Sequence, residues 1–261
     1  MKNLTKALLG AVALTSSFAG VAHAQDASPF AMSAAIAVQS DYRFRGISQN
    51  DREPAPQATI NVTGPEGFYI GAWASKTNWA LNGTNNPSYE ADLYFGKNTD
   101  LFGFANWNAQ IYYYSYPDAR TVGAFSATSN ASYLELINTL SKDWGGFTTN
   151  FTWAYSPEFS LGGGTGNYVS GQAVLPVNDW LSFSGLVGHQ WVQAAKYAGS
   201  SDYTHYDIGA TATYRNFALD LRFVDTDLSK AQCAAFYMGT PNACGSTVVA
   251  TLTYNIPSFP W

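Results

Sequence analysis

The sequence carries little charge. Asp, Glu, Lys and Arg make up 12% of its 261 residues, about half the share of roughly 25% found in soluble domains. Apart from one stretch near the N-terminus, it has no run of about 18 apolar residues, which excludes a bundle of membrane helices. The formal net charge is −5 without a basic cluster, so we expect no nucleic acid among its partners.

Cysteine is scarce as well, with only Cys233 and Cys244 in the chain. In an exported protein we expect this pair to form a disulfide, which would stabilise a loop by about 3 kcal/mol by restricting the unfolded chain. A redox or metal role is disfavoured, because catalytic cysteine pairs usually have two residues between them and no histidine cluster lies nearby. The acidic residues lack the spacing of a calcium loop. We therefore expect no metal and no cofactor.

Export itself is predicted by residues 1–24, which have the features of a secretory signal peptide. Lys2 and Lys6 supply the positive start, an apolar stretch follows, and residues 22–24 form a small-x-small cleavage site. The apolar stretch is short and broken by hydroxyl residues, which disfavours a permanent membrane anchor. Residues 25–261 are then expected to form a single mature domain.

The mature sequence is rich in aromatic residues, 16% of the chain, and its apolar residues alternate with polar ones. In the segment 89–95, the odd positions are apolar or aromatic, whereas Glu90, Asp92 and Tyr94 occupy the even positions. Segments 57–63, 205–214 and 217–224 repeat this pattern. A period of two residues is typical of β-strands and not of helices.

Extended over the chain, the alternation predicts twelve strands: 32–45, 55–64, 67–78, 88–97, 103–115, 132–142, 146–156, 167–176, 180–193, 203–214, 216–226 and 246–256. Short turns and longer loops alternate between them. This is the arrangement of an up-and-down barrel in an outer membrane, which exposes no unpaired strand edge to lipid. We therefore predict an all-β fold, a transmembrane antiparallel β-barrel of about 12 strands, surrounded by lipid of a Gram-negative outer membrane.

The cost of placing charge in lipid indicates which face of each strand points inward. Arg or Lys at the bilayer midplane costs roughly 2–4 kcal/mol, so charged positions should face the interior. This reasoning predicts a pore lining of six acids and three bases, which favours cations: Asp41, Arg43, Arg45, Glu90, Asp92, Glu135, Asp207, Asp220 and Arg222. The alternative is that these side chains pair with one another and simply fill the barrel.

Four tryptophans, Trp79, Trp144, Trp180 and Trp191, fall near the ends of predicted strands. Aromatic residues form a girdle at the membrane boundary of such barrels. We expect these four side chains to belong to it, with burial in an ordinary core as the alternative.

The mature chain keeps two histidines, His189 and His205. His205 shares the predicted inward face with Asp207, where a structural role or a hydrogen bond is expected. A lipid hydrolase would need a serine beside a histidine, but Ser182 and Ser184 lie on the opposite parity to His189. We therefore expect no enzyme activity.

Three parts of the sequence carry a family resemblance: residues 40–49 with Pro54, Ala55 and Gln57, residues 67–75, and the block from Asp225–Ser229 through Cys233 and Cys244 to Val248 and Val249. Together they resemble the TorF family of proposed porins, exported proteins of Gram-negative bacteria. The resemblance implies an outer-membrane barrel with a pore role. One departure is that Pro257 and Pro260 interrupt the end of the chain, so the last strand is expected to stop near Ile256 and leave a short tail.

These observations predict a channel for passive diffusion of small hydrophilic solutes or ions. Charged side chains lining a water-filled interior would set its ion preference. Two alternatives come from other classes: a closed barrel whose outer loops bind a ligand or partner, and a membrane-embedded lipid hydrolase.

Overall fold

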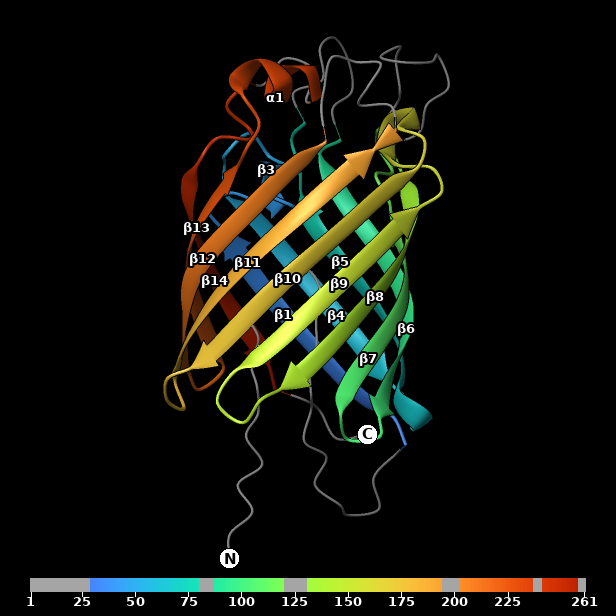
Figure 1. Cartoon of the computed structure of the whole chain (residues 1–261), viewed down its shortest axis with the longest axis vertical. Helices are drawn as coiled ribbons and strands as arrows, with labels where there is room; N and C mark the ends of the chain where they lie inside the picture. The colour runs from blue at the N-terminus through green and yellow to red at the C-terminus, as the bar shows by residue number, and fades with distance from the viewer. Residues whose placement is uncertain (1–28, 80–86, 120–130, 194–201, 237–240, 258–261) are drawn as a thin grey trace, which may run out of the picture.

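The computed structural model describes residues 29–79, 87–119, 131–193, 202–236 and 241–257, most of which form a closed β-barrel (Figure 1). Twelve strands make its wall, and each is antiparallel to both neighbours. The predicted all-β, 12-strand antiparallel barrel is confirmed. The strands are β1 (Ala31–Gln39), β4 (Ala55–Thr63), β5 (Phe68–Lys76), β6 (Tyr89–Leu101), β7 (Ala105–Tyr114), β8 (Tyr133–Asp143), β9 (Thr148–Ser156), β10 (Gly166–Pro176), β11 (Leu181–Val192), β12 (Tyr203–Tyr214), β13 (Phe217–Thr226) and β14 (Thr247–Ile256).

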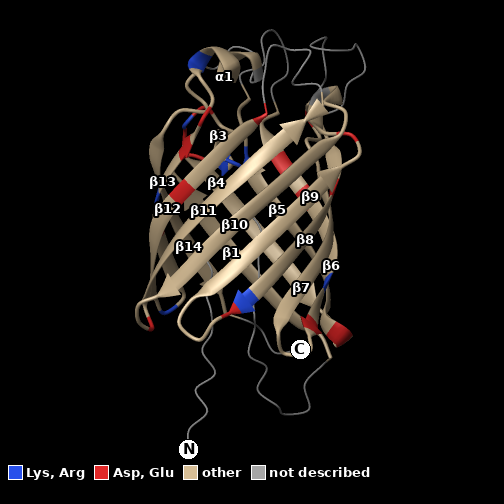
Figure 2. Cartoon of the chain, viewed as in Figure 1, with Lys and Arg blue, Asp and Glu red and all other residues tan. Residues whose placement is uncertain are grey.

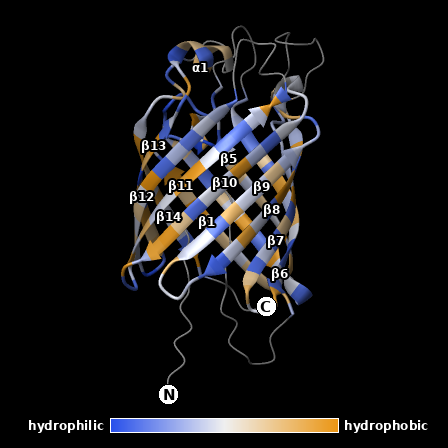
Figure 3. Cartoon of the chain, in the orientation of Figure 1, coloured by the Kyte–Doolittle hydropathy of each residue, from blue (hydrophilic) through white to orange (hydrophobic). Residues whose placement is uncertain are grey.

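The alternation of the sequence sets the two faces of the wall. On β13, Leu219 and Leu221 point outward and are 42% and 49% exposed, whereas the intervening Asp220 and the following Arg222 point inward. Hydrophobic side chains on the outside recur on other strands, and the ribbon coloured by hydropathy alternates along them (Figure 3). Charged residues are sparse along the strands (Figure 2). An exposed apolar surface of this extent on a barrel is the surface that lipid covers.

Short turns and longer connections occupy opposite ends of the barrel, as predicted. The β6–β7 and β12–β13 turns contain three and two residues. At the other end, the β13–β14 connection holds the short helix α1 (Lys230–Phe236). No helix in the described parts of the chain is long and apolar enough to cross a membrane. The start of β1 pairs with the end of β14, and Ala34 lies opposite Ile256 in this pairing. These strand ends lie at the end of the barrel that carries the short turns.

Four sequence predictions need correction or fall outside the described residues. The first strand ends at Gln39 and not at residue 45, and β6 continues to Leu101, beyond the predicted residue 97. Trp79 is buried and contacts the ring of Tyr116 at 4.4 Å between centroids, so its assignment to an exposed girdle was wrong. The predicted signal peptide, residues 1–24, lies outside the described residues.

The other three tryptophans lie where the sequence placed them. Trp144 and Trp180 are 56% and 55% exposed at the short-turn end, and Trp191 is 41% exposed near the opposite end of β11. Their indole rings are therefore available on the outer surface at both ends of the barrel, which is the position of an interfacial aromatic girdle.

Candidate functional site in the barrel interior

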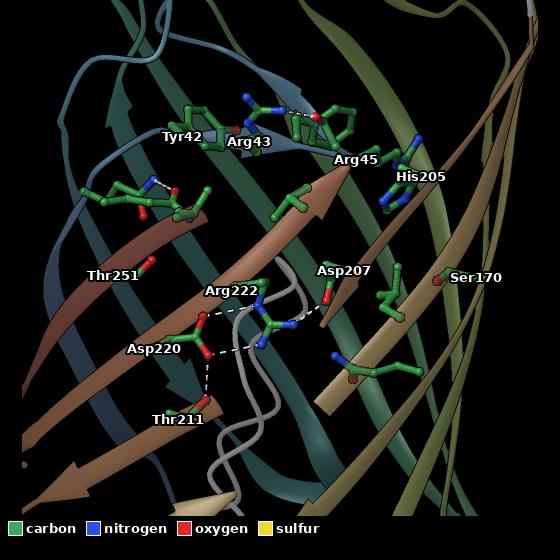
Figure 4. Close-up of a pocket in the computed structure, with 18 of the residues that line it drawn as sticks. Tyr42, Arg43, Arg45, Ser170, His205, Asp207, Thr211, Asp220, Arg222 and Thr251 are labelled. Carbon is green, nitrogen blue, oxygen red and sulfur yellow. Dashed lines mark hydrogen bonds and ion pairs between the residues drawn. The ribbon is translucent and has the colours of Figure 1, made fainter. Parts of the chain in front are cut away.

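The predicted inward residues of the wall lie inside the barrel. Glu90 and Asp92 on β6 and Glu135 on β8 are at most 2% exposed. Asp207 on β12 and the β13 pair Asp220 and Arg222 also face the interior, where Figure 4 shows them pointing toward one another. That these side chains line a conducting path stays a prediction.

Asp41, Arg43 and Arg45 also lie inside, but not on the wall as predicted. After β1 the chain turns into the interior and forms a small hairpin of β2 (Arg43–Phe44) and β3 (Ile47–Ser48), which pair only with each other. Residues 41–50 are called the inner hairpin below. Polar and aromatic residues alternate in the hairpin as they do in the wall, so the alternation alone extended the first strand too far.

A two-residue turn at Arg45 and Gly46 makes the hairpin possible. Both residues have positive φ, 47° and 86°, as a type I′ hairpin turn requires. A Cβ atom on Gly46 would come within 2.7 Å of His205 on β12 and of Thr226 on β13. Only glycine fits there, because the turn of the hairpin packs directly against β12 and β13. The glycine directly after Arg45 was the one signal in the sequence that could have revealed the turn.

Arg45 anchors this tip through a buried ion pair. Its guanidinium donates to the two carboxylate oxygens of Glu135 at 2.9 and 2.6 Å and to Oε1 of Gln190 at 2.5 Å. The guanidinium carbon also lies 4.0 Å from the ring centroid of Tyr168, within the range of a cation–π interaction. Burial lowers the pKa of Arg45, but the nearby Glu135 carboxylate outweighs this and raises it overall. The guanidinium of Arg45 therefore keeps its charge in this buried position.

The long loop between β13 and β14 also holds the inner hairpin. Arg43 pairs with Asp41 at 2.7 Å and donates to the carbonyl of Gly245 at 2.8 Å. The backbone N–H of Ser48 donates to the carbonyl of Ala243 at 2.9 Å. Ile47 packs in a buried cluster with the side chains of the disulfide loop. The hairpin is thus attached to the β13–β14 loop.

That loop is closed by the predicted disulfide, which the structure contains between Cys233 and Cys244. Both cysteines are at most 1% exposed and belong to the same cluster as Ile47. The disulfide therefore does more than restrain its own loop: it shapes the surface against which the inner hairpin packs.

One side of the interior is filled by a continuous arc of aromatic rings, which the sequence analysis missed. Tyr94 stacks on Tyr112 at 5.1 Å, and Tyr114 stacks on Tyr133 at 4.5 Å, between ring centroids. Phe44 of the inner hairpin packs edge-on against Tyr114 at 5.5 Å. On β6, Tyr94 lies on the same face as Glu90 and Asp92, because all three occupy even-numbered positions. This alternation was the signal in the sequence that could have placed Tyr94 inside the barrel. Aromatic pairs of this geometry add about 0.5–1.5 kcal/mol beyond the burial of their area.

Hydroxyl groups of these rings hold the carboxylates of the wall. The hydroxyl of Tyr42 donates to Glu90 at 3.0 Å, and that of Tyr112 donates to Asp92 at 2.9 Å. The hydroxyl of Tyr114 donates to Glu135 at 3.2 Å. The part of the interior around the inner hairpin, called the upper interior below, is therefore a connected network of acids, tyrosines and the hairpin itself.

Below the inner hairpin lies a chamber with a cavity volume of about 200 Å³, which is partly open to solvent. Arg222 crosses it, with Asp207 on one side and Asp220 on the other, the latter at 3.1 Å (Figure 4). Two acids around one base leave this trio with an excess negative charge. Among the other residues that line the chamber are ten with a neutral amide or hydroxyl side chain: Gln39, Gln57, Asn150, Thr152, Ser170, Gln172, Thr211, Thr251, Thr253 and Asn255.

Neither histidine meets a serine in its described hydrogen bonds. His205 faces inward, as predicted, and its Nε2 lies 2.9 Å from the hydroxyl of Tyr168. His189 lies on the outward face beside Trp191, with Nδ1 2.9 Å from the hydroxyl of Thr204. The described partner of Ser184 Oγ is Arg222, at 2.9 Å.

Comparisons with known proteins agree with the fold. A family model described as a bacterial protein of unknown function, Gcw_chp, matches residues 23–255. A search of curated proteins finds no match. Among solved structures, a KdgM porin in complex with disordered oligogalacturonate has a TM-score of 0.54 and 6% identity, covering 86% of this chain and 99% of that chain. A NanC porin has a TM-score of 0.51 and 12% identity, covering 84% and 97%. At these identities the similarity concerns the fold alone.

Proposed function

Because the chain belongs to the Gcw_chp family of bacterial proteins, whose description assigns no function, we propose a function from its interior: an outer-membrane channel for passive diffusion of small hydrophilic solutes or ions. The single observation that carries the proposal is the contrast between an apolar outer surface and a polar interior with a solvent-open chamber. A barrel that served only as a membrane anchor would not need such a chamber. No covalent chemistry and no cofactor are required.

Two similarities support the proposal. The KdgM and NanC structures that share this fold are described as porins. The resemblance of residues 40–49 and of the C-terminal block to the TorF family implies an outer-membrane barrel with the same role, and the sequence features of residues 1–24 support a cleavable signal peptide for export. The KdgM structure holds oligogalacturonate, which supports a polar solute as the partner class for this chain without identifying it.

In this proposal the nine predicted charged residues divide into two groups. Asp207, Asp220 and Arg222 line the chamber and interact with the passing solute. The upper group, Asp41, Arg43, Arg45, Glu90, Asp92 and Glu135, sets the width of the outer mouth, because the inner hairpin forms the roof of the chamber. Polar groups in such a path replace part of the hydration shell of the solute.

Planar-bilayer recording tests the proposal. In a gradient of potassium chloride, we expect discrete conductance steps and a reversal potential on the potassium side, because acids outnumber bases in the interior. A paired change of Asp207→Asn and Asp220→Asn should move the reversal potential toward the chloride side, since Arg222 would then be unpaired. A reversal potential that does not respond to this change would contradict the assigned pore lining.

One observation favours a second candidate, a closed barrel whose outer loops bind a ligand or partner. The inner hairpin fills the upper interior, where Tyr42 and Ile47 are at most 2% exposed. Bilayer recording distinguishes the two functions. If the natural protein and Arg45→Ala both fold correctly and neither conducts, the result favours the closed barrel over the channel.

A further inference from the structure

The barrel wall forms a pocket in the upper interior that the chain itself fills. Glu135 on β8, Gln190 on β11 and Tyr168 on β10 surround the guanidinium of Arg45, and each of the three is at least nine-tenths buried. We infer that this pocket is a binding site for the guanidinium or primary ammonium group of a cationic organic solute, and that Arg45 is its built-in competitor.

The chemistry of the pocket matches a flat organic cation. The two oxygens of Glu135 accept two hydrogen bonds in parallel, the arrangement that a guanidinium group satisfies best. Gln190 adds an amide oxygen as a further acceptor. Its amide nitrogen donates to the backbone carbonyls of Asn167 and Trp191, each at 3.0 Å, which fixes the orientation of the amide. The face of Tyr168 supplies a cation–π contact. A neutral sugar or an anion would leave the carboxylate without a counter-charge.

The group that fills the pocket can leave without opening the barrel. β2 and β3 form a sheet of their own and share no ladder with the wall. Among the described residues, two backbone hydrogen bonds join the inner hairpin to other loops, from Ser48 to Ala243 and from Asn78 to Gln49. Displacing the hairpin therefore breaks side-chain contacts and bonds to loops while the twelve strands stay paired.

Exchange of one cation for another explains how the hairpin could be released. Leaving Glu135 buried without a counter-charge is costly, so the hairpin stays inserted when the pocket has no other occupant. A solute carrying a guanidinium or ammonium group compensates the same carboxylate and removes this cost. The inference rests on the proposed channel, because the solute must reach the pocket through the interior.

Calorimetric titration of the full barrel in detergent with agmatine, which carries both groups, tests the inference. We expect Arg45→Ala to bind one agmatine at least about tenfold more tightly than the natural protein, because the competing side chain is gone. Adding Glu135→Gln to Arg45→Ala should weaken binding at least about tenfold, since the counter-charge is lost. As a matched control, Arg215→Ala removes an arginine from a short turn and should behave as the natural protein.

Equal affinity of Arg45→Ala with and without Glu135→Gln would overturn the inference, as would natural protein that binds as tightly as Arg45→Ala. If Arg45→Ala does not fold, Arg45→Gln removes the charge while preserving much of the side-chain volume, and the same comparisons apply. Bilayer recording separates this inference from the channel itself. Binding without conductance would count against the channel, whereas conductance without Glu135-dependent binding would count against the cation site.

Discussion

Replacing Arg45 with alanine is expected to raise the single-channel conductance several-fold. The substitution removes the ion pair with Glu135 and the contact with Tyr168 that hold the tip of the inner hairpin. Breaking one side of a buried pair costs about 3–5 kcal/mol. This shifts the balance from inserted to displaced hairpin on the order of a hundredfold or more. Planar-bilayer recording of purified Arg45→Ala beside the natural protein measures the effect.

A double-mutant cycle separates this explanation from a general loosening of the barrel. Glu135→Gln should raise the conductance in the same direction, and the combination of both changes should add little to either one, because residues that form one pair are not additive. Arg215→Ala should leave the conductance unchanged. Independent, additive increases from Arg45 and Glu135 would show that their pairing does not hold the hairpin.

Opening the disulfide is expected to produce the second large effect. Cys233 and Cys244 pack with Ile47 of the inner hairpin, and a closed loop of this size is worth about 3 kcal/mol. In the double substitution of both cysteines by serine, the loop loses this constraint and the hairpin loses its shaped support. We expect larger and more variable conductance steps than in the natural protein, recorded under identical bilayer conditions.

The same effect should follow from chemistry on the natural protein. Addition of a thiol reductant on the side of the long loops should bring its conductance toward that of the double serine variant, and should leave the variant itself unchanged. A natural protein whose conductance is insensitive to reduction, with free thiols confirmed by labelling, would contradict the role assigned to this loop.

The sequence predicted the wall of the barrel well because one physical rule governs it. Each strand of the wall has lipid on one side and the barrel interior on the other. Apolar and polar side chains must therefore alternate along it with a period of two residues. Leu219, Asp220 and Leu221 show the rule at single-residue resolution. The same rule misplaced Asp41, Arg43 and Arg45, because a hairpin inside the barrel alternates as a strand of the wall does.

The contacts of the site could not be predicted in the same way. Arg45 and Glu135 are far apart in the sequence, and their meeting depends on how far the inner hairpin reaches and on the registers of the five strand pairings from β1 to β8. A one-residue shift in any register would turn side chains to the opposite face. The aromatic arc also depends on neighbouring strands, because stacking of Tyr94 on Tyr112 needs both to face inward at one level.

Attaching a nitroxide label in turn at Leu219, Asp220 and Leu221 tests the central claim most directly, namely that lipid covers the apolar face and the polar face encloses the interior. In bilayers, collision with dissolved oxygen should be frequent for labels at Leu219 and Leu221, whereas a label at Asp220 should collide preferentially with a water-soluble nickel chelate or be shielded from both. Equal oxygen accessibility at all three positions, or preferential oxygen access at Asp220, would contradict the account.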